Sequence, residues 1–459
     1  MDLTDQVKHV MPARLTGTVS RTVGMTISAD GFPAPVGALA QIDRETGDSL
    51  EAEVIGFRDH MTLLYAFSDL AGIRHGNRVH LKRTSRWLRV GDQLLGRVID
   101  AHGQAIDGRP QASLPDRAAF QRQAPHPCTR PRIDTPLSTG IRAIDGLMTC
   151  GRGQRVGIFA GSGVGKSVSL GMMARYTDAD VIVIALIGER GREVNEFIER
   201  DLGPEGRKKS VVVVATSNEP ALVRVHAAST ATAIAEYFRD QGKDVLLLVD
   251  SLTRFALAQR EIGLAAGEPP TTRGYPPSVF ALLPRLVERA GRTPEGSITA
   301  FYTVLVEGDD PNEPVADAVR GLLDGHIWLS RKIAAKNHYP AIDVLESLSR
   351  LMPEVTDEEH RQAAATMREL MAAHRDHEDL ISIGAYRKGA NPAVDLAVDM
   401  QSEINAMLRQ RVEERASYSQ ARDILIQFHQ TATQKLGAMQ SASQPGSTAQ
   451  PSQATASFQ

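Results

Sequence analysis

The pattern of hydrophobic and polar positions changes twice along the 459 residues. Over residues 1–92, short apolar runs such as Thr18–Val23, Met25–Ser28 and Glu53–Phe57 are separated by glycines. Closely spaced turn residues between short strands are typical of a small β-barrel or sandwich. We therefore expect an N-terminal β-barrel domain over residues 1–92.

From Gly151 onward, continuous runs of Val, Ile and Leu alternate with longer helical stretches. These runs predict strands at Arg155–Ala160, Val181–Ile187, Val211–Ala215, Val245–Val249, Ile298–Leu305 and His326–Leu329. Wholly apolar strands that are spaced widely enough for crossover helices indicate a parallel sheet buried on both faces. The predicted fold class is α/β, with a core over residues 93–350. Its proline-rich segment, residues 110–136, is expected to be a connector, because proline removes a backbone donor and fixes φ.

Beyond residue 351 the strand pattern stops and a helical pattern begins. Thr356–Glu359 matches a capping box, and apolar residues follow it at helical spacing. We expect a C-terminal helical domain over residues 351–440. The last residues, 441–459, are polar and low in complexity, which predicts a disordered tail.

Composition narrows the class of protein. The chain is 42% hydrophobic and 23% charged, as an ordinary soluble globular protein is, and its formal net charge is −3. A dedicated nucleic-acid binder is usually basic, so no nucleic-acid partner is expected. Two cysteines provide neither a disulfide framework nor a structural zinc site. No apolar run is long enough to span a bilayer and the N-terminus lacks a signal-peptide layout, so the protein is expected to be cytoplasmic.

The strongest chemical signal is the loop Ala160–Ser167, AGSGVGKS, between a predicted strand and a predicted helix. Glycines let backbone N–H groups turn inward around phosphate oxygens, and the helix N-terminus adds a favourable dipole. Lys166 can reach the β- and γ-phosphates, and the Ser167 hydroxyl can bind Mg²⁺. The predicted nucleotide-binding residues are Gly161, Ser162, Gly163, Val164, Gly165, Lys166, Ser167 and Val168.

Two acidic residues follow predicted strands. Asp250 ends an apolar strand, where a carboxylate can lie beside Mg²⁺ through a coordinated water. Glu189 and Arg190 follow the strand Val181–Ile187. A carboxylate there can orient a water, and a guanidinium can bind γ-phosphate oxygens. Spacing alone leaves open the alternative that Glu189 and Arg190 belong to a solvated charged turn.

For the basic stretch at residues 74–89, a solvated strand face is favoured over an anionic partner or a lipid surface.

Three longer segments add to these motifs: LGRVIDAHGQAIDG (95–108), DSLTRFALAQREIGLAAGEPP (250–270) and HYPAIDVLESLSR (338–350). Taken together, the motifs and the segments resemble one superfamily. The resemblance is to the catalytic subunits of rotary and hexameric ATPases, and most of all to the ATPases of type III protein export. It implies a RecA-like P-loop core with a mainly parallel sheet. It also implies that Glu189 polarises the attacking water beside Arg190, and that Arg350 is an arginine finger reaching into the neighbouring subunit.

The same resemblance implies that Tyr339 stacks on adenine. Tyr386 is a candidate for the other face of the base, although a core or surface tyrosine is an equal alternative. A Mg²⁺-dependent ATP hydrolase is implied, working as a homohexamer that releases export substrates from chaperones and unfolds them. Expected partners are stator, regulator and stalk proteins, export chaperones and substrates, and a membrane export gate at the inner face of the cytoplasmic membrane.

Four alternatives stand beside the favoured flagellar export ATPase. The system could be an injectisome, or the chain could be the catalytic subunit of a rotary ATP synthase or vacuolar-type enzyme. An RNA-binding hexameric translocase is the alternative from another class, and it predicts salt-sensitive RNA affinity. An inactive nucleotide-binding scaffold is disfavoured because Lys166, Glu189, Asp250 and Arg350 are all intact.

Overall fold

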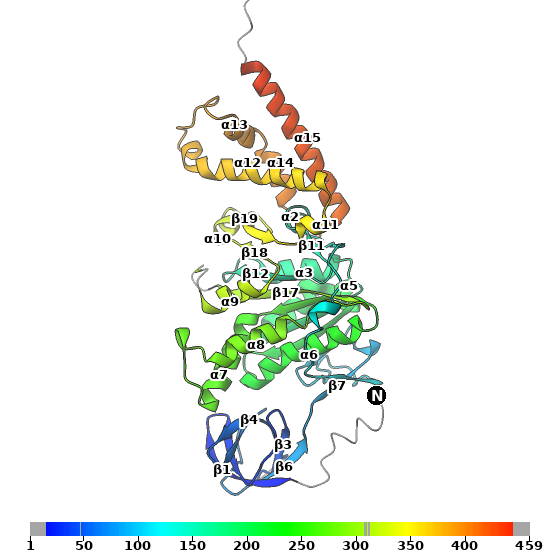
Figure 1. The fold of residues 1–459 in the computed structure, drawn as a ribbon, viewed down its shortest axis with the longest axis vertical. Helices are drawn as coiled ribbons and strands as arrows, with labels where there is room; N and C mark the ends of the chain where they lie inside the picture. Colours follow the sequence, from blue (N-terminus) through cyan, green and yellow to red (C-terminus); the bar gives the residue numbers. More distant parts are fainter. Residues whose placement is uncertain (1–14, 46, 307–309, 311–312, 444–459) are drawn as a thin grey trace, which may run out of the picture.

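Three regions follow one another along the long axis of the molecule, in the order of the sequence (Figure 1). The computed structural model describes residues 15–45, 47–306, 310 and 313–443. A strand barrel lies at one end, a sheet covered by helices lies in the middle, and a group of helices lies at the other end. This is the predicted fold class.

The N-terminal region is a closed six-stranded barrel in the order β1-β2-β5-β4-β3-β6. Its strands are β1 (Thr16–Val23), β2 (Thr26–Asp30), β3 (Leu39–Ile42), β4 (Leu50–Arg58), β5 (Met61–Ala66) and β6 (Arg78–Arg83). Inward residues such as Val19, Ile27 and Val54 are buried, and closure leaves no free sheet edge. The predicted barrel is confirmed for the part of residues 1–92 that the structure describes, which excludes residues 1–14.

The core sheet has the order β19-β18-β12-β17-β15-β13-β14-β8. Its strands are β8 (Val98–Asp100), β12 (Arg155–Ala160), β13 (Val181–Glu189), β14 (Ser210–Thr216), β15 (Asp244–Asp250), β17 (Ser297–Leu305), β18 (Gly325–Leu329) and β19 (Ile342–Ser349), with β16 (Gly291–Arg292) beside β17. All six predicted strands are present. Only β19 and β16 run antiparallel to their neighbours. The sequence did not predict β19, because its side chains alternate between buried and exposed instead of forming an apolar run.

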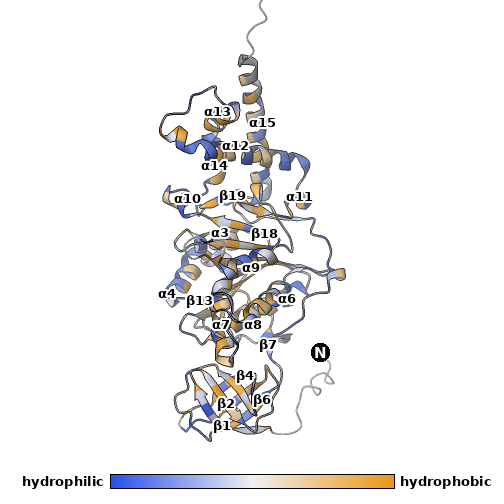
Figure 2. Cartoon of the chain, turned by 60° about the vertical axis from the view of Figure 1, so that its left-hand side comes forward, coloured by the Kyte–Doolittle hydropathy of each residue, from blue (hydrophilic) through white to orange (hydrophobic). Residues whose placement is uncertain are grey.

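Helices cover both faces of this sheet. One hydrophobic cluster joins alternate strand residues, such as Ile182 and Ile184, to α2 (Arg142–Leu147), α3 (Lys166–Tyr176) and the C-terminal helices. The other cluster joins the intervening residues, such as Val183, to the opposite layer. That layer consists of α6 (Ala221–Arg239), α7 (Leu252–Ala266), α8 (Pro277–Val287) and α9 (Pro314–Leu322). Figure 2 shows the apolar residues concentrated on the central strands and on the helix sides that face them. The sheet is therefore buried on both faces, as predicted.

The remaining short elements connect these layers. They are β7 (Trp87–Val90), β9 (Asp116–Ala119), β10 (Pro136–Leu137), β11 (Cys150–Gly151), α4 (Gly191–Glu196), α5 (Gly203–Lys208), α10 (Arg331–Ala335) and α11 (Met352–Val355), with single turns at Asp92–Leu94, Pro127–Thr129, Phe197–Leu202 and Thr272–Gly274. The connector over residues 110–136 is mostly irregular, but it does contain a strand. Strand β9 occupies its proline-free stretch and pairs with β7.

The C-terminal helices are α12 (Glu358–Ser382), α13 (Pro392–Asp399), α14 (Gln401–Leu408) and α15 (Tyr418–Ser443). Helix α12 starts one residue later than the capping box predicted. The Asp357 carboxylate, not Thr356, accepts the backbone N–H of His360 at 2.9 Å, while the Thr356 hydroxyl donates to the Met352 carbonyl at 2.6 Å. Helix α15 continues to Ser443, so the predicted tail begins inside it, and residues 444–459 lie outside the described residues. None of the helices in the described ranges combines the length and apolarity that a bilayer span needs.

One member of the basic stretch at 74–89 is not on a solvated face. Arg86 lies between the barrel and the core, with its guanidinium 4.6 Å from the centre of the Phe120 ring and 2.8 Å from Nδ1 of His102. Burial lowers the pKa of Arg86. For this residue the expectation of a solvated face is wrong, because the side chain fills the joint between two regions that only the folded chain brings together.

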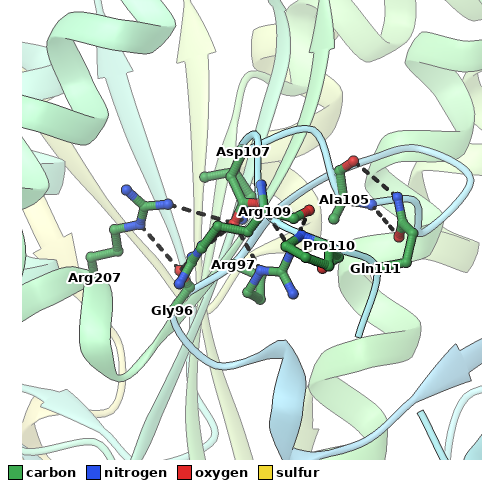
Figure 3. Close-up of polar contacts among 9 residues, drawn as sticks. Gly96, Arg97, Ala105, Asp107, Arg109, Pro110, Gln111 and Arg207 are labelled. Atoms are coloured by element: carbon green, nitrogen blue, oxygen red, sulfur yellow. Dashed lines mark hydrogen bonds and ion pairs between the residues drawn. The ribbon is translucent and has the colours of Figure 1, made fainter. Parts of the chain in front are cut away.

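A buried carboxylate fastens the edge strand β8 to its surroundings (Figure 3). Asp107, whose side chain is 2% exposed, accepts hydrogen bonds from Arg97 Nε at 2.8 Å and Arg109 Nη2 at 2.7 Å. Arg97 also donates to the Pro110 carbonyl at 2.9 Å, and Arg207 of α5 donates to the Gly96 carbonyl at 3.1 Å. These guanidiniums hold the pKa of Asp107 well below its usual range.

We predict that Asp107→Asn lowers the free energy of unfolding by about 2–3 kcal/mol, because it leaves the buried guanidinium of Arg97 without its anion. Since the pKa of Asp107 is depressed in the folded state, its contribution is present above the ordinary carboxyl pKa of about 3.9 and is lost as the pH falls below it. Denaturant unfolding at neutral pH and at a series of pH values below about 3.9 measures both effects. Asp134→Asn, which breaks an exposed pair with Arg292, is the control and should unfold like the wild type. Equal stability of Asp107→Asn and the wild type would contradict the assignment.

Candidate nucleotide site

The predicted phosphate loop forms the junction between β12 and α3. Gly163 and Gly165 have φ angles of 79° and 91°, a left-handed conformation that favours glycine. Between them, Val164 is 2% exposed and anchors the loop in the core. Gly161 is also buried, whereas Ser162 and Gly163 are exposed and Val168 packs against the core. Helix α3 begins at Lys166, so its first N–H groups point toward the loop, where an anionic phosphate is favoured.

The aromatic ring of Tyr339 borders this loop. A methyl group added at Gly165 would lie 3.7 Å from the ring, which is ordinary van der Waals contact. Tyr339 is 44% exposed, so it contacts the loop without being buried by it. The carbonyl of Tyr339 accepts the N–H of Gln410 at 3.0 Å, which ties this segment to the C-terminal helices.

Lys166 contacts both predicted carboxylates. Its ammonium lies against Oδ1 of Asp250, at the end of β15, and 3.5 Å from Oε1 of Glu189, at the end of β13. These strands are adjacent and parallel, so their ends share one edge of the sheet. Strand β13 is two residues longer than predicted, which makes Glu189 its last residue and not part of a solvated turn. The site therefore brings Lys166, Glu189 and Asp250 together.

Glu189 has an unusual electrostatic environment. Burial raises the pKa of its carboxyl to about 7, and the charge of Asp250 and a hydrogen bond with Glu193 act in the same direction. The positive charges of Lys166 and Arg254 oppose this shift. A carboxyl group that titrates near neutral pH can take or give a proton under physiological conditions.

Asp250 has the donor chemistry expected beside a magnesium ion. Its Oδ1 accepts a hydrogen bond from the Thr303 hydroxyl at 2.8 Å, whereas no described residue hydrogen-bonds its Oδ2. The Ser167 hydroxyl lies at the start of the same helix as Lys166. Oxygen donors of this kind suit Mg²⁺, which uses one or two protein ligands together with water and phosphate oxygens. Within the described ranges, no cluster of three or more His, Cys, Asp or Glu side chains could hold a metal ion by itself.

Two predicted arginines are not in contact with this site. The Arg190 side chain is 77% exposed and pairs with Glu193 at 3.1 Å. Arg350 follows β19, which runs antiparallel to β18, and its N–H donates to the Asp324 carbonyl at 2.9 Å. That hydrogen bond lies beside the start of β12, whereas the phosphate loop follows the end of β12. The five residue-to-residue steps along β12, at about 3.3 Å each, separate Arg350 from the phosphate loop by about 17 Å along the strand. Arg350 is exposed, and no hydrogen bond or ion pair joins its side chain to another described residue.

Tyr386 lies in the segment between α12 and α13. Its hydroxyl donates to the Asn391 carbonyl and lies 3.0 Å from Oδ1 of Asp395. Among the described residues, no hydrogen bond or ring contact joins Tyr386 to Tyr339 or to the phosphate loop. The structure thus brings Tyr339 to the loop and holds Tyr386 within the C-terminal helices.

Sequence reasoning missed three residues of the site. Arg254 of α7 lies 3.3 Å from Oε2 of Glu189 and also donates to the Gly188 carbonyl. Its signal was the DSLTR segment, which places an arginine one helical turn after Asp250. Thr303 is one of several hydroxyl-bearing residues in β17, and Glu193 shares a hydrogen bond with Glu189. No local pattern distinguishes these two from ordinary strand and helix residues.

A phosphate loop between a strand and a helix, with carboxylates at the ends of neighbouring parallel strands, defines a P-loop nucleotide-binding protein. Residues 140–349 match the family model described as the ATP synthase alpha/beta family, nucleotide-binding domain, and residues 356–427 match the T3SS EscN ATPase C-terminal domain. The chain belongs to the family of flagellar and type 3 secretion ATPases, and it is an ATPase.

Similar proteins include both branches of this family. The chain is 50% identical over 420 residues to the "Flagellum-specific ATP synthase" of Bacillus subtilis, covering 91% of this chain and 94% of that one. It is 50% identical over 413 residues to the "Type 3 secretion system ATPase" of Xanthomonas euvesicatoria, covering 90% and 93%. The solved structure of the assembled ATPase EscN from enteropathogenic E. coli is 46% identical, with a TM-score of 0.85 over 90% of this chain and all of that one. These similarities confirm the predicted fold class and the predicted enzyme class.

Proposed function

We propose that this protein hydrolyses ATP, bound as its magnesium complex, to energise chaperone release and the unfolding of substrates in a flagellar export apparatus. The observation that supports this proposal most is the convergence of Lys166, Glu189 and Asp250 at the N-terminus of α3. A cation there can neutralise phosphate charge, and the two carboxylates have the positions needed to orient a water and to hold a metal-bound water.

On nucleotide binding, Lys166 turns from the carboxylates to the β- and γ-phosphates. Ser167 and Oδ2 of Asp250, which no described residue hydrogen-bonds, would hold Mg²⁺, Asp250 through a coordinated water. The ion neutralises charge on the phosphates when it is bound. Tyr339 stacks on adenine with its ring. For Tyr386, the hydrogen bonds to Asn391 and Asp395 favour the alternative of a structural tyrosine of the C-terminal helices over a contact with the other face of the base.

Glu189 orients the water that attacks the γ-phosphate in line. A base is most effective when its pKa lies near the working pH, and the pKa of Glu189 is raised to about 7. Arg190 neighbours the γ-phosphate. It is linked to the base through Glu193, which pairs with Arg190 and shares a hydrogen bond with Glu189.

We predict that Glu189→Gln keeps nucleotide affinity but lowers kcat by roughly 10²–10⁴-fold, because the amide preserves shape without a base. In the wild type, kcat/KM should fall as the pH drops below about 7, since protonation of the Glu189 carboxyl, whose pKa is raised, removes the base. The kcat/KM of the variant should not fall in this pH range. Phosphate release and fluorescent-nucleotide binding across this pH range measure both. Glu196→Gln, on the exposed side of α4 where it pairs with Arg192, is the control with normal turnover. Near-normal turnover in Glu189→Gln would refute the role.

We further infer that each site is completed by a second copy of the chain. Arg350 lies at the opposite edge of the sheet from its own phosphate loop, so only the Arg350 of a neighbouring subunit can reach the γ-phosphate. A homohexameric ring brings the two edges of adjacent subunits together. The solved structures of EscN, one assembled and one in complex with its central stalk EscO, support an oligomer and a stalk partner.

Arg350→Ala is expected to keep the nucleotide affinity of the monomer and to lower kcat about 10³-fold or more. Specific activity should no longer rise with protein concentration. Mixing this variant with Glu189→Gln should restore activity, because some sites then pair an intact Glu189 with an intact Arg350 from the neighbour. Arg375→Ala, which breaks the partly exposed pair between α12 and Asp343 at the start of β19, should retain the concentration dependence. Absence of recovery in the mixture would exclude a role in trans.

The proposed partners follow from work at an export gate. They are stator, regulator and stalk proteins, export chaperones and their substrates, and the gate itself, at which the protein works peripherally on the cytoplasmic face of the membrane. No nucleic-acid partner is proposed. Relatives named for the flagellum, including that of Caulobacter vibrioides over 93% of this chain, support the flagellar branch. Relatives named for type 3 secretion are similarly identical, so the branch needs a cellular test.

Deleting the gene from its natural host is expected to abolish swimming and the export of flagellin, because filament growth depends on substrate delivery. Secretion of injectisome substrates should be unaffected. Restoring the wild-type gene should recover swimming, whereas a Lys166→Ala gene should not. Normal swimming together with lost secretion of injectisome substrates would assign the protein to the other branch.

A further inference from the structure

The backbone that carries Arg350 is held by one buried amide, the side chain of Gln154. Gln154 has no exposed surface and lies immediately before β12. Its Nε2 donates to Oγ of Ser349 at 3.0 Å and to the Asp324 carbonyl at 3.1 Å. The second acceptor is the carbonyl that also receives the N–H of Arg350 at 2.9 Å. Gln154 therefore contacts both anchors of the turn that presents Arg350.

Each polar atom of this amide has at least one hydrogen-bond partner. Both N–H groups of Nε2 have partners, and Oε1 accepts the N–H of Gly151 at 2.8 Å. The Ser349 hydroxyl is fixed in turn, since it donates to the Thr149 carbonyl at 2.8 Å. A fully satisfied buried amide specifies one arrangement of its neighbours, because any displacement leaves a polar group without a partner.

The other side of the turn is equally constrained. Gly325 passes so close to β19 that an added methyl group would lie 2.6 Å from the Leu348 carbonyl and 3.4 Å from Nε2 of Gln154. The Asp324 carboxylate accepts from Arg155 Nε at 3.1 Å. The main-chain position of Arg350 is thus fixed from two strands, while its side chain is left exposed.

We propose that Gln154 is a positioning residue for catalysis in the neighbouring subunit. The inference rests on the proposed role of Arg350 in trans. Gln154 does not touch nucleotide and acts through the backbone of residues 349 and 350. It fixes where the guanidinium of Arg350 enters the next site, and a displacement of about 1 Å at a catalytic group can reduce a rate about 10²-fold. Its loss should therefore impair the neighbour's site and not the site of its own chain.

Gln154→Met, which keeps the side-chain volume without the amide, is expected to lower kcat roughly 10–10²-fold while the KM for ATP and the nucleotide affinity of the monomer stay unchanged. Gln154→Glu should act similarly, because its second oxygen would face the Asp324 carbonyl. Ser349→Ala removes only one of the two acceptors of the Gln154 amide, so it should also lower kcat, but by less than Gln154→Met. It is also the mildest of these changes for folding.

The decisive measurement is activity after mixing with Glu189→Gln subunits, which supply an intact Gln154 and Arg350. We expect the mixture with Gln154→Met, or with Ser349→Ala, to exceed the sum of its components, as the Arg350→Ala mixture should. Gln410→Met is the matched control. Gln410 is a buried amide whose Nε2 donates to the Gly140 and Glu414 carbonyls and whose Oε1 accepts from Arg142 N–H, remote from Arg350. Its mixture should show no gain.

The outcomes separate this inference from the function on which it rests. If Arg350→Ala recovers in the mixture but Gln154→Met and Ser349→Ala do not, Gln154 is structural only and the inference falls alone. Equal recovery with Gln410→Met would also overturn it, since general stabilisation by the partner would explain the gain. If Arg350→Ala itself fails to recover, the proposed role in trans fails and this inference fails with it.

Discussion

The ammonium of Lys166 holds together two carboxylates that would otherwise repel each other. Glu189 and Asp250 have side chains that are only 10% and 3% exposed, so water screens their charges poorly. Lys166 and Arg254 provide the compensating positive charge. Burial nevertheless raises the pKa of Glu189, and the charge of Asp250 adds to this shift. Lys166 is thus the cation at which the two carboxylates and the start of α3 meet.

The sheet topology brings these groups to one point. Strands β13 and β15 are neighbours, and their residues meet in register, Leu186 beside Asp250. Strand β12 delivers the phosphate loop to the same edge. The edge strand β19 runs antiparallel to β18, and it carries Arg350 to the opposite edge. The reversal of this strand thus separates Arg350 from Lys166, Glu189 and Asp250 within a single chain.

Local patterns were sufficient to predict the six apolar strands of the sheet, the phosphate loop and the carboxylate at the end of β15, because each depends on residues close together in the sequence. They failed where a residue is defined by distant neighbours. Arg86 looked like one basic residue among several, and its burial depends on His102 and Phe120. Thr303 and Gln154 are likewise ordinary polar residues in the sequence. Their significance comes from partners on other strands, which pairing rules alone do not specify.

The separation of the two edges has a geometric consequence for assembly. A contact that joins the loop edge of one copy to the Arg350 edge of the next is head-to-tail, so it does not satisfy itself in a two-fold dimer. An open row of n copies would contain n−1 finished active sites, with one unfinished site at an end. Closure into a circle finishes the last site without adding a subunit. Turnover per subunit would then report how completely the circles are closed.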